Sequence, residues 1–281
     1  MGLSNEIVYR LPQVTGELAF LARMAERPQT YAFDPPGGGP RSNIVFEPHA
    51  VPIHDLRPVA TEVSLEREGF ALLDAPTGVR DLYDEGALRR DYYREAEQLV
   101  TQATGASRVV IFDHTIRRRQ EGVADRTAGQ PRQPAEHIHA DYTEGSGPER
   151  LRQVMGKEAG ELLDRRYAIV NVWRPIRGPL RDMPLAVCDT TTVRQADLIE
   201  QDLIYRDRIG HIYGLNYDPE QRWFYVPEMR REEVLLLKCY DSLRDGRARF
   251  MPHTAFRDPT APEDIPPRES LELRTLAFFD S

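Results

Sequence analysis

The stretch His137-Ile138-His139-Ala140-Asp141-Tyr142-Thr143 carries two histidines and an aspartate in close succession. If this stretch ends a strand, the side chains of His139 and Asp141 point to the same side of the backbone, because strand side chains alternate in direction. One short turn then supplies an imidazole nitrogen and a carboxylate oxygen. A second histidine far along the chain, His253 in Met251-Pro252-His253-Thr254-Ala255-Phe256, can complete the set. Two histidines and one carboxylate leave three adjacent positions open on an octahedral metal, a geometry that suits non-haem Fe(II).

Chance is the alternative explanation for a His-x-Asp in a chain with 7 His and 45 acidic residues. In that case the stretch is a surface loop whose aspartate caps a helix. Short motifs often match by chance, so this one needs support from the rest of the chain. A jelly-roll metal site needs a strand-rich segment between Asp141 and His253, so that an early turn and a late strand meet at one mouth of the barrel.

Short apolar runs with turn signals between them follow the motif. They lie at 166–175, 185–189, 212–215, 223–226, 234–240 and 271–279. Helical patterns are expected at about 86–103, where Gly105 follows as a stop, and at 147–164. Many short strands with few helices predict a mainly β fold of the α+β class, an antiparallel sandwich or barrel with a helical layer.

Composition favours one folded domain over residues 1–281, with about 1–50 as an N-terminal extension packing on the core. The net charge of −8 argues against nucleic-acid and anionic-membrane partners. Cys188 and Cys239 are too few for a disulfide framework and indicate a reducing compartment. Because no apolar run is long enough to cross a bilayer and no leader is visible, we expect a cytoplasmic monomer or homodimer.

The last predicted strand carries Arg268 and Arg274, which share a face with Ser270 and Glu272 because strand side chains repeat every second residue. An iron oxygenase with an oxo-acid cosubstrate needs a fixed cation for the distal carboxylate. Arginine suits this task because its planar fork pairs bidentately. Arg268 is slightly favoured, since Arg268-Glu269-Ser270 resembles the Arg-x-Ser on the last strand of many 2-oxoglutarate oxygenases, and Arg274 stays as the alternative.

Several further stretches extend the resemblance from about Ile53 to Phe279. The chain resembles the CmcJ/AsaB-like family of hydroxylases and desaturases. The stretches that carry this resemblance are His114 to Arg117, His139-Ala140-Asp141-Tyr142-Thr143, Asn171-Val172-Trp173-Arg174-Pro175, Pro184-Leu185-Ala186-Val187-Cys188-Asp189, Lys238-Cys239-Tyr240-Asp241-Ser242, His253-Thr254-Ala255-Phe256 and Arg268-Glu269-Ser270-Leu271-Glu272-Leu273-Arg274.

The resemblance implies a double-stranded β-helix, a distorted, cupin-like jelly roll with helices packed on the major sheet. It implies an Fe(II)- and 2-oxoglutarate-dependent oxygenase that uses O2 to hydroxylate, desaturate or oxidatively cyclise a small molecule of secondary metabolism, through a ferryl species. His139, Asp141 and His253 fall on the metal and catalytic positions, and the last-strand arginine falls on the cosubstrate position.

Other polar and aromatic residues near the motifs are weaker candidates. We expect Tyr142, Arg174, Arg117 and Trp173 to contact substrate or cosubstrate, although Arg174 before a proline can equally be a surface group and Trp173 can be core. Two other classes share part of this pattern. One is a cupin-like metal dioxygenase or isomerase without 2-oxoglutarate, and the other is a non-catalytic small-molecule-binding barrel.

Overall fold

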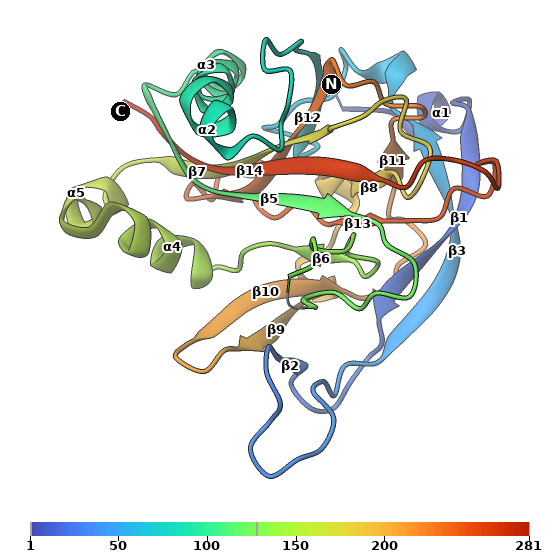
Figure 1. Cartoon of the computed structure of the whole chain (residues 1–281), viewed down its shortest axis with the longest axis horizontal. Coiled ribbons are helices and arrows are strands. Elements are labelled where there is room, and N and C mark those ends of the chain that lie inside the picture. Colours follow the sequence, from blue (N-terminus) through green and yellow to red (C-terminus); the bar gives the residue numbers. More distant parts are fainter. Residues whose placement is uncertain (1, 128, 281) are drawn as a thin grey trace.

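The computed structural model describes residues 2–127 and 129–280, which form two β-sheets and a layer of helices (Figure 1). In spatial order, the larger sheet contains β1 (Gln13–Leu21), β3 (Phe46–Asp55), β11 (Trp223–Tyr225), β8 (Leu185–Cys188), β13 (His253–Ala255), β6 (His139–Ala140), β10 (Ile209–Leu215), β9 (Leu198–Ile204) and β2 (Gln29–Tyr31). The smaller sheet contains β4 (Phe70–Asp74), β12 (Glu233–Asp241), β7 (Tyr167–Pro175), β14 (Glu269–Phe278) and β5 (Arg108–Arg118).

Two parts of the chain, β5 to β8 and β11 to β14, alternate between the two sheets from one strand to the next. β5, β7, β12 and β14 belong to the smaller sheet, while β6, β8 and β13, which fall between them in the chain, belong to the larger sheet. This alternation is the winding of a double-stranded β-helix, so the expected mainly β jelly roll is confirmed. β1 and β2 lie within residues 1–50, the segment expected to be an extension, and both are strands of the larger sheet.

The helices lie outside the two sheets. They are α1 (Asn5–Val8), α2 (Glu85–Ala87), α3 (Tyr93–Thr104), α4 (Ser146–Met155) and α5 (Ala159–Leu163), with a π-helical turn (Leu88–Tyr92) joining α2 to α3 and short 3-10 turns at Arg57–Val59, Gly156–Glu158, Thr190–Thr192 and Gln195–Asp197. α3 packs on β5, β14 and β7, above the smaller sheet in Figure 1. α3 is followed by Gly105, which ends the helix in a left-handed conformation with a φ of 72°. Glycine adopts this φ readily because it has no Cβ. Over the described residues no helix is both long and apolar enough to span a bilayer.

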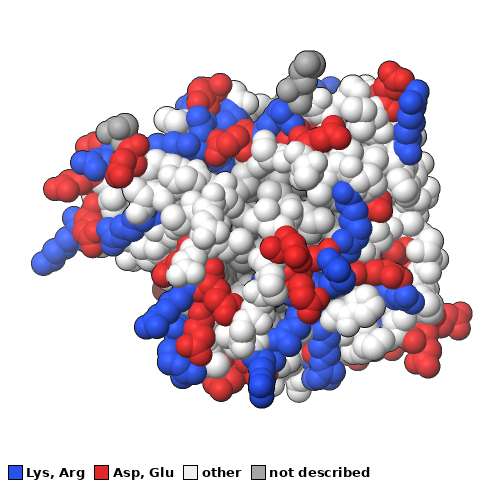
Figure 2. Space-filling model, turned by 90° about the horizontal axis from the view of Figure 1, so that it is seen from above, with Lys and Arg blue, Asp and Glu red and all other residues white. Residues whose placement is uncertain are grey.

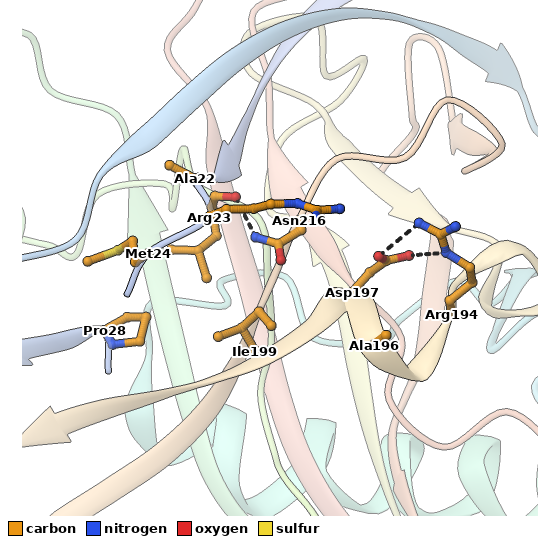
Figure 3. Close-up of a pocket in the computed structure, with 10 residues that line it drawn as sticks. Ala22, Arg23, Met24, Pro28, Arg194, Ala196, Asp197, Ile199 and Asn216 are labelled. Atoms are coloured by element: carbon orange, nitrogen blue, oxygen red, sulfur yellow. Dashed lines mark hydrogen bonds and ion pairs between the residues drawn. The ribbon is translucent and has the colours of Figure 1, made fainter. Parts of the chain in front are cut away.

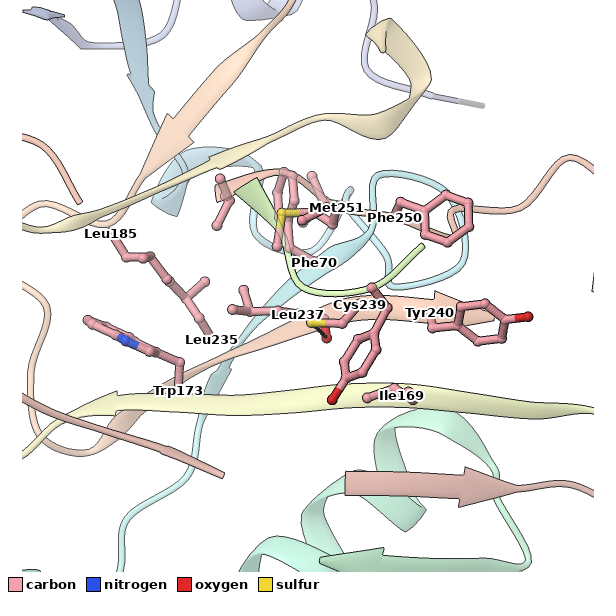
Figure 4. Close-up of a cluster of buried hydrophobic side chains, with 14 of the residues drawn as sticks. Phe70, Ile169, Trp173, Leu185, Leu235, Leu237, Cys239, Tyr240, Phe250 and Met251 are labelled. Carbon is pink, nitrogen blue, oxygen red and sulfur yellow. Dashed lines mark hydrogen bonds between the residues drawn. The ribbon is translucent and has the colours of Figure 1, made fainter. Parts of the chain in front are cut away.

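The core between the sheets follows from strand alternation. On β8, Leu185 and Val187 belong to the cluster between the two sheets, whereas Ala186 and Cys188 belong to a second cluster on the other face. Figure 4 shows Leu185 across from Trp173 within the first cluster. The face that carries residues of odd number on β8 is therefore the face that looks into the barrel.

Single residues explain two local features. α1 begins after Ser4 because the Ser4 side chain accepts a hydrogen bond from the Ile7 N–H. β3 continues unbroken through Pro48 and Pro52. Proline is tolerated there because β11 pairs only with Ile53 to Asp55, which leaves one side of the earlier residues free of that partner.

Candidate metal centre

Three potential metal ligands meet at one point of the barrel. His139 on β6 and His253 on β13 are direct cross-strand partners, so their side chains lie on the same face of the larger sheet, with ring centroids 4.6 Å apart. Asp141 follows β6 by one residue, and its Oδ1 lies 3.6 Å from His139 Nε2. One ligand atom from each of the three residues lies within 4.8 Å of the other two. The structure therefore brings the predicted triad together.

Backbone carbonyls orient both imidazole rings. His139 Nδ1 lies 3.0 Å from the His137 carbonyl oxygen, and His253 Nδ1 lies 3.3 Å from the Met251 carbonyl oxygen. A carbonyl only accepts hydrogen bonds, so each Nδ1 carries the proton and donates it. Each Nε2 then keeps a free lone pair, which is the arrangement of metal-binding histidines.

The charges of the three groups also fit a divalent metal. Burial, and then the neighbouring His253, lowers the pKa of His139 to about 3, so its ring is neutral at physiological pH. Burial alone would raise the pKa of Asp141, but His253 and Arg274 hold it below the ordinary value of 3.8. The neutral His139 ring, the Nε2 lone pair of His253 and the Asp141 carboxylate form the donor set of a non-haem Fe(II) site with open positions, so the residues present fit iron.

A second group of residues surrounds the Asp141 carboxylate. Asn171 Nδ2, from β7 of the opposite sheet, donates a hydrogen bond of 2.6 Å to Asp141 Oδ2. Cys239 Sγ, from β12, lies 3.7 Å from the same oxygen. The sequence pointed to no role for Asn171, although its even spacing from Trp173 on one strand already placed both on one face. Its contact with Asp141 depends on how the two sheets face each other, which no local pattern shows.

Arg268 is a buried cation that lines the same cavity as the triad. Its Nε donates to Ser270 Oγ at 3.1 Å, its Nη1 donates to the Met183 carbonyl at 2.8 Å, and its guanidinium lies 5.0 Å from the Trp173 ring. Among the described residues, no carboxylate forms an ion pair with this guanidinium. Burial, together with repulsion from Arg117, lowers the pKa of Arg268 below its ordinary value. Such a site favours an anionic ligand.

Arg274 has a different environment on the same strand. Its Nη1 donates to Asp113 Oδ2 at 3.1 Å and to Thr115 Oγ1 at 2.9 Å, and its Nη2 forms an ion pair with Glu272 at 2.5 Å. Burial would lower the pKa of Arg274, but Glu272 and Asp141 raise it above the ordinary value. The charge of Arg274 is therefore already balanced by the protein.

The predicted substrate contacts divide into two groups. Arg117 and Trp173 line the cavity at the triad, and Tyr142 is buried directly after the ligand Asp141. Arg174 points to the other face of β7, where its guanidinium lies 4.9 Å from the Tyr92 ring and its Nη2 donates to the Ala75 carbonyl. The structure therefore does not bring Arg174 to the triad, because adjacent strand residues face opposite ways.

A larger cavity lies away from these residues. It measures about 460 Å³ and lies beside the end of β1 and the start of β9. Asn216 Nδ2 donates to the Leu21 carbonyl at its wall. Figure 3 shows Asp197 paired with Arg194 there. None of its lining residues is a member of the triad, and the cavity at the triad itself is only about 20 Å³.

Comparisons with known proteins show which family the chain belongs to. A family described as an oxidoreductase/YMDC permease-like domain matches residues 18–278. The hydroxylase/desaturase EfuI of Hormonema carpetanum is 34% identical over 263 residues, covering 85% of this chain and 86% of its own. The Fe(II)/2-oxoglutarate-dependent dioxygenase NvfI of Aspergillus novofumigatus is 32% identical over 257 residues, covering 88% and 90%. A solved structure of the iron and alpha-ketoglutarate-dependent endoperoxidase NvfI covers 97% of this chain and 100% of its own, with 30% identity and a TM-score of 0.86.

Proposed function

Because this chain belongs to the family of Fe(II)- and 2-oxoglutarate-dependent hydroxylases and desaturases, we propose that His139, Asp141 and His253 hold its iron and that Arg268 and Ser270 hold its cosubstrate. The protein is an oxygenase that oxidises a small molecule in secondary metabolite biosynthesis, with Fe(II), 2-oxoglutarate and O2 as cofactor and cosubstrates. Neither alternative class, the metal isomerase without an oxo acid or the non-catalytic barrel, agrees with this membership.

The observation that carries the proposal is the cluster of three ligand atoms within 4.8 Å of one another. When bound, the iron supplies the oxidising chemistry, in which O2 and 2-oxoglutarate are consumed to oxidise a C–H bond and succinate and CO2 are released. The residues of this chain supply position and charge. The two Nε2 atoms and the Asp141 carboxylate would hold the metal and would leave its remaining coordination positions for small molecules.

Arg268 is proposed for the distal carboxylate because its charge has no carboxylate partner among the described residues, whereas Arg274 has two. Arg117, across the strand pair from Ser270, contributes a second positive charge to this end of the cavity. The space there is about 20 Å³, so the cosubstrate must displace side chains when it binds. The long side chains of Arg117 and Glu272 line this space.

Substrate contacts and cellular context complete the proposal. Tyr142, Trp173 and Arg117 form the wall for the organic substrate, and Arg174 supports β7 from the opposite face. We propose a single double-stranded β-helix domain over 1–281, cytoplasmic, monomeric or homodimeric, with no nucleic-acid partner. In Figure 2, Lys and Arg alternate with Asp and Glu around the face shown, without a broad region of positive charge, which supports the last point.

The test is anaerobic Fe(II) binding by the wild type, His253→Ala and Asp141→Ala, with His211→Ala as the control. His211 is a half-exposed histidine paired with Asp202 at 2.8 Å and lies outside the triad. We expect one tight Fe(II) per chain in the wild type and in the control, and a loss of at least about 100-fold in affinity in either ligand variant. Unchanged Fe(II) binding in both ligand variants would exclude the triad.

A further inference from the structure

The Asp141 carboxylate is held asymmetrically, and this asymmetry has a consequence for how it can bind a metal. Its Oδ2 receives the 2.6 Å hydrogen bond from Asn171 Nδ2 and lies 3.7 Å from Cys239 Sγ. Its Oδ1 faces the histidines, 3.6 Å from His139 Nε2. Oδ2 is therefore bound by side chains of the opposite sheet, and Oδ1 points to the position where the three ligand atoms meet.

The donor comes from a rigid part of the fold, whereas the carboxylate does not. Asn171 is fully buried near the middle of β7, which is hydrogen-bonded to β12 on one side and to β14 on the other. Asp141 lies on a bend directly after β6, a strand of two residues. Because so short a strand constrains its neighbour weakly, the direction of the carboxylate depends on a contact from outside its own strand.

The amide orientation of Asn171 follows from this contact. A carboxylate oxygen only accepts hydrogen bonds, so the NH2 group must face Asp141. The Asn171 Oδ1 then has no hydrogen-bond partner among the described residues, although it is buried. Leaving a buried acceptor unpaired is unfavourable, so the bond to Asp141, which is short and charge-assisted, must offset that cost.

We propose that Asn171 is a positioning residue that keeps Asp141 monodentate, with Oδ1 toward the metal and Oδ2 turned away. This inference depends on the proposed function, since it takes Asp141 as a metal ligand. A bidentate carboxylate would occupy a fourth coordination position. Two positions are needed for a chelating keto acid and one for O2, so a monodentate Asp141 keeps all three available.

Cys239 contributes less to the same oxygen. A thiol is a weak donor, its distance to Oδ2 is long, and Sγ also lies 3.6 Å from the Leu237 carbonyl. Burial raises the pKa of the Cys239 thiol, so it remains protonated and uncharged. It is therefore a matched control position: Cys239→Ala changes the packing around Asp141 without removing a strong hydrogen bond.

The experiment compares Asn171→Val with Asn171→Thr, because the two side chains have nearly the same shape and only threonine has a hydroxyl donor. Both residues are β-branched and suit a central strand. The probe is Co(II) alone, measured anaerobically by calorimetry and by its visible d–d spectrum, which reports coordination number. The melting temperature of each metal-free variant is measured first.

We expect Asn171→Val to bind Co(II) about 10- to 100-fold more weakly than the wild type. Its d–d spectrum should change because the second oxygen of Asp141 becomes a fourth protein contact to the metal. Asn171→Thr should recover part of the affinity, and Cys239→Ala should stay within about threefold of the wild type. If Asn171→Val does not fold, Asn171→Leu takes its place. Its side chain is similar in size to that of asparagine but has no hydrogen-bond donor, so it should weaken Co(II) binding by about the same factor of 10 to 100.

The Asp141→Ala variant distinguishes a failure of the positioning role from a failure of the proposed metal site. If Asp141→Ala loses Co(II) while Asn171→Val keeps wild-type affinity and spectrum, the positioning role is wrong and the proposed metal site stands. Equal weakening in the Val and Thr variants would assign the loss to side-chain shape and would also overturn the positioning role. If Asp141→Ala itself binds Co(II) as the wild type does, the proposed metal site is wrong.

Discussion

Truncation of Arg268 to alanine should weaken 2-oxoglutarate binding strongly. The Arg268 guanidinium is buried, with an exposed fraction of 1%, and its protein partners are the Ser270 hydroxyl and the Met183 carbonyl, not a carboxylate. Removing one partner of a buried charged pair costs about 2–5 kcal/mol. Arg117 lies close enough to affect the pKa of Arg268 and would retain part of the attraction, so we expect about 2–4 kcal/mol, which is about 30- to 1,000-fold in Kd.

The assay is calorimetric titration of the Mn(II)-loaded protein with 2-oxoglutarate, and Trp173 fluorescence provides an independent readout because its ring lies 5.0 Å from the guanidinium. Arg118→Ala is the matched control. Arg118 is the next residue along β5 from Arg117, is half exposed, and pairs with Glu269 on the face away from the triad. A Kd for Arg268→Ala within about threefold of the wild type would refute the assignment.

Two further predictions concern stability. A Cβ on Gly147 would lie 2.3 Å from Cδ2 of the buried Tyr240 ring, so Gly147→Ala should cost about 1–3 kcal/mol by chemical denaturation, whereas Gly145→Ala, where a Cβ has open space, should change stability by less than about 1 kcal/mol. If the two variants are equally stable, this packing argument fails. Burial raises the pKa of Asp125, but Arg132 and the Gln133 N–H lower it to a net value of about 2, against an ordinary 3.8. Because the folded-state pKa is the lower one, the stabilisation is complete above the ordinary value and is lost as the pH falls toward 2. The Asp125 side chain is 38% exposed, so solvent screening reduces this stabilisation, and we expect the ionised carboxylate to contribute about 1 kcal/mol to the free energy of unfolding. The measurement is the difference in that free energy between the wild type and Asp125→Asn. A difference that does not shrink below pH 4 would contradict this.

The sequence pattern predicted a mainly β sandwich or barrel and grouped the triad, and the family resemblance implied the double-stranded β-helix. Strand runs of about the right length at 166–175, 185–189 and 234–240 correspond to β7, β8 and β12, because alternation and turn residues act locally. His139 and Asp141 were predictable as a unit because a spacing of two residues puts both side chains on one face. His253 was predictable because a late strand of this fold returns beside the early one.

The remaining features depend on packing between elements that are distant in sequence. Arg268 and Arg274 have the same strand parity, and only their partners distinguish them, since Asp113 and Glu272 balance Arg274. Arg174 was expected at the site, but the register of β7 directs it to the face that packs under the helices. Asn171 reaches Asp141 only because the two sheets face each other, and a local sequence pattern does not predict a contact between residues on different sheets.

The central claim is that His139, Asp141 and His253 form one Fe(II) site that presents open positions to 2-oxoglutarate. Its most direct test is an anaerobic titration of metal-free protein with Fe(II) and then 2-oxoglutarate, followed by visible absorption. We expect the charge-transfer band of an iron-chelated keto acid, saturating at one Fe(II) per chain and absent from His253→Ala. Fe(II) binding without that band, or a band of full intensity in His253→Ala, would contradict it.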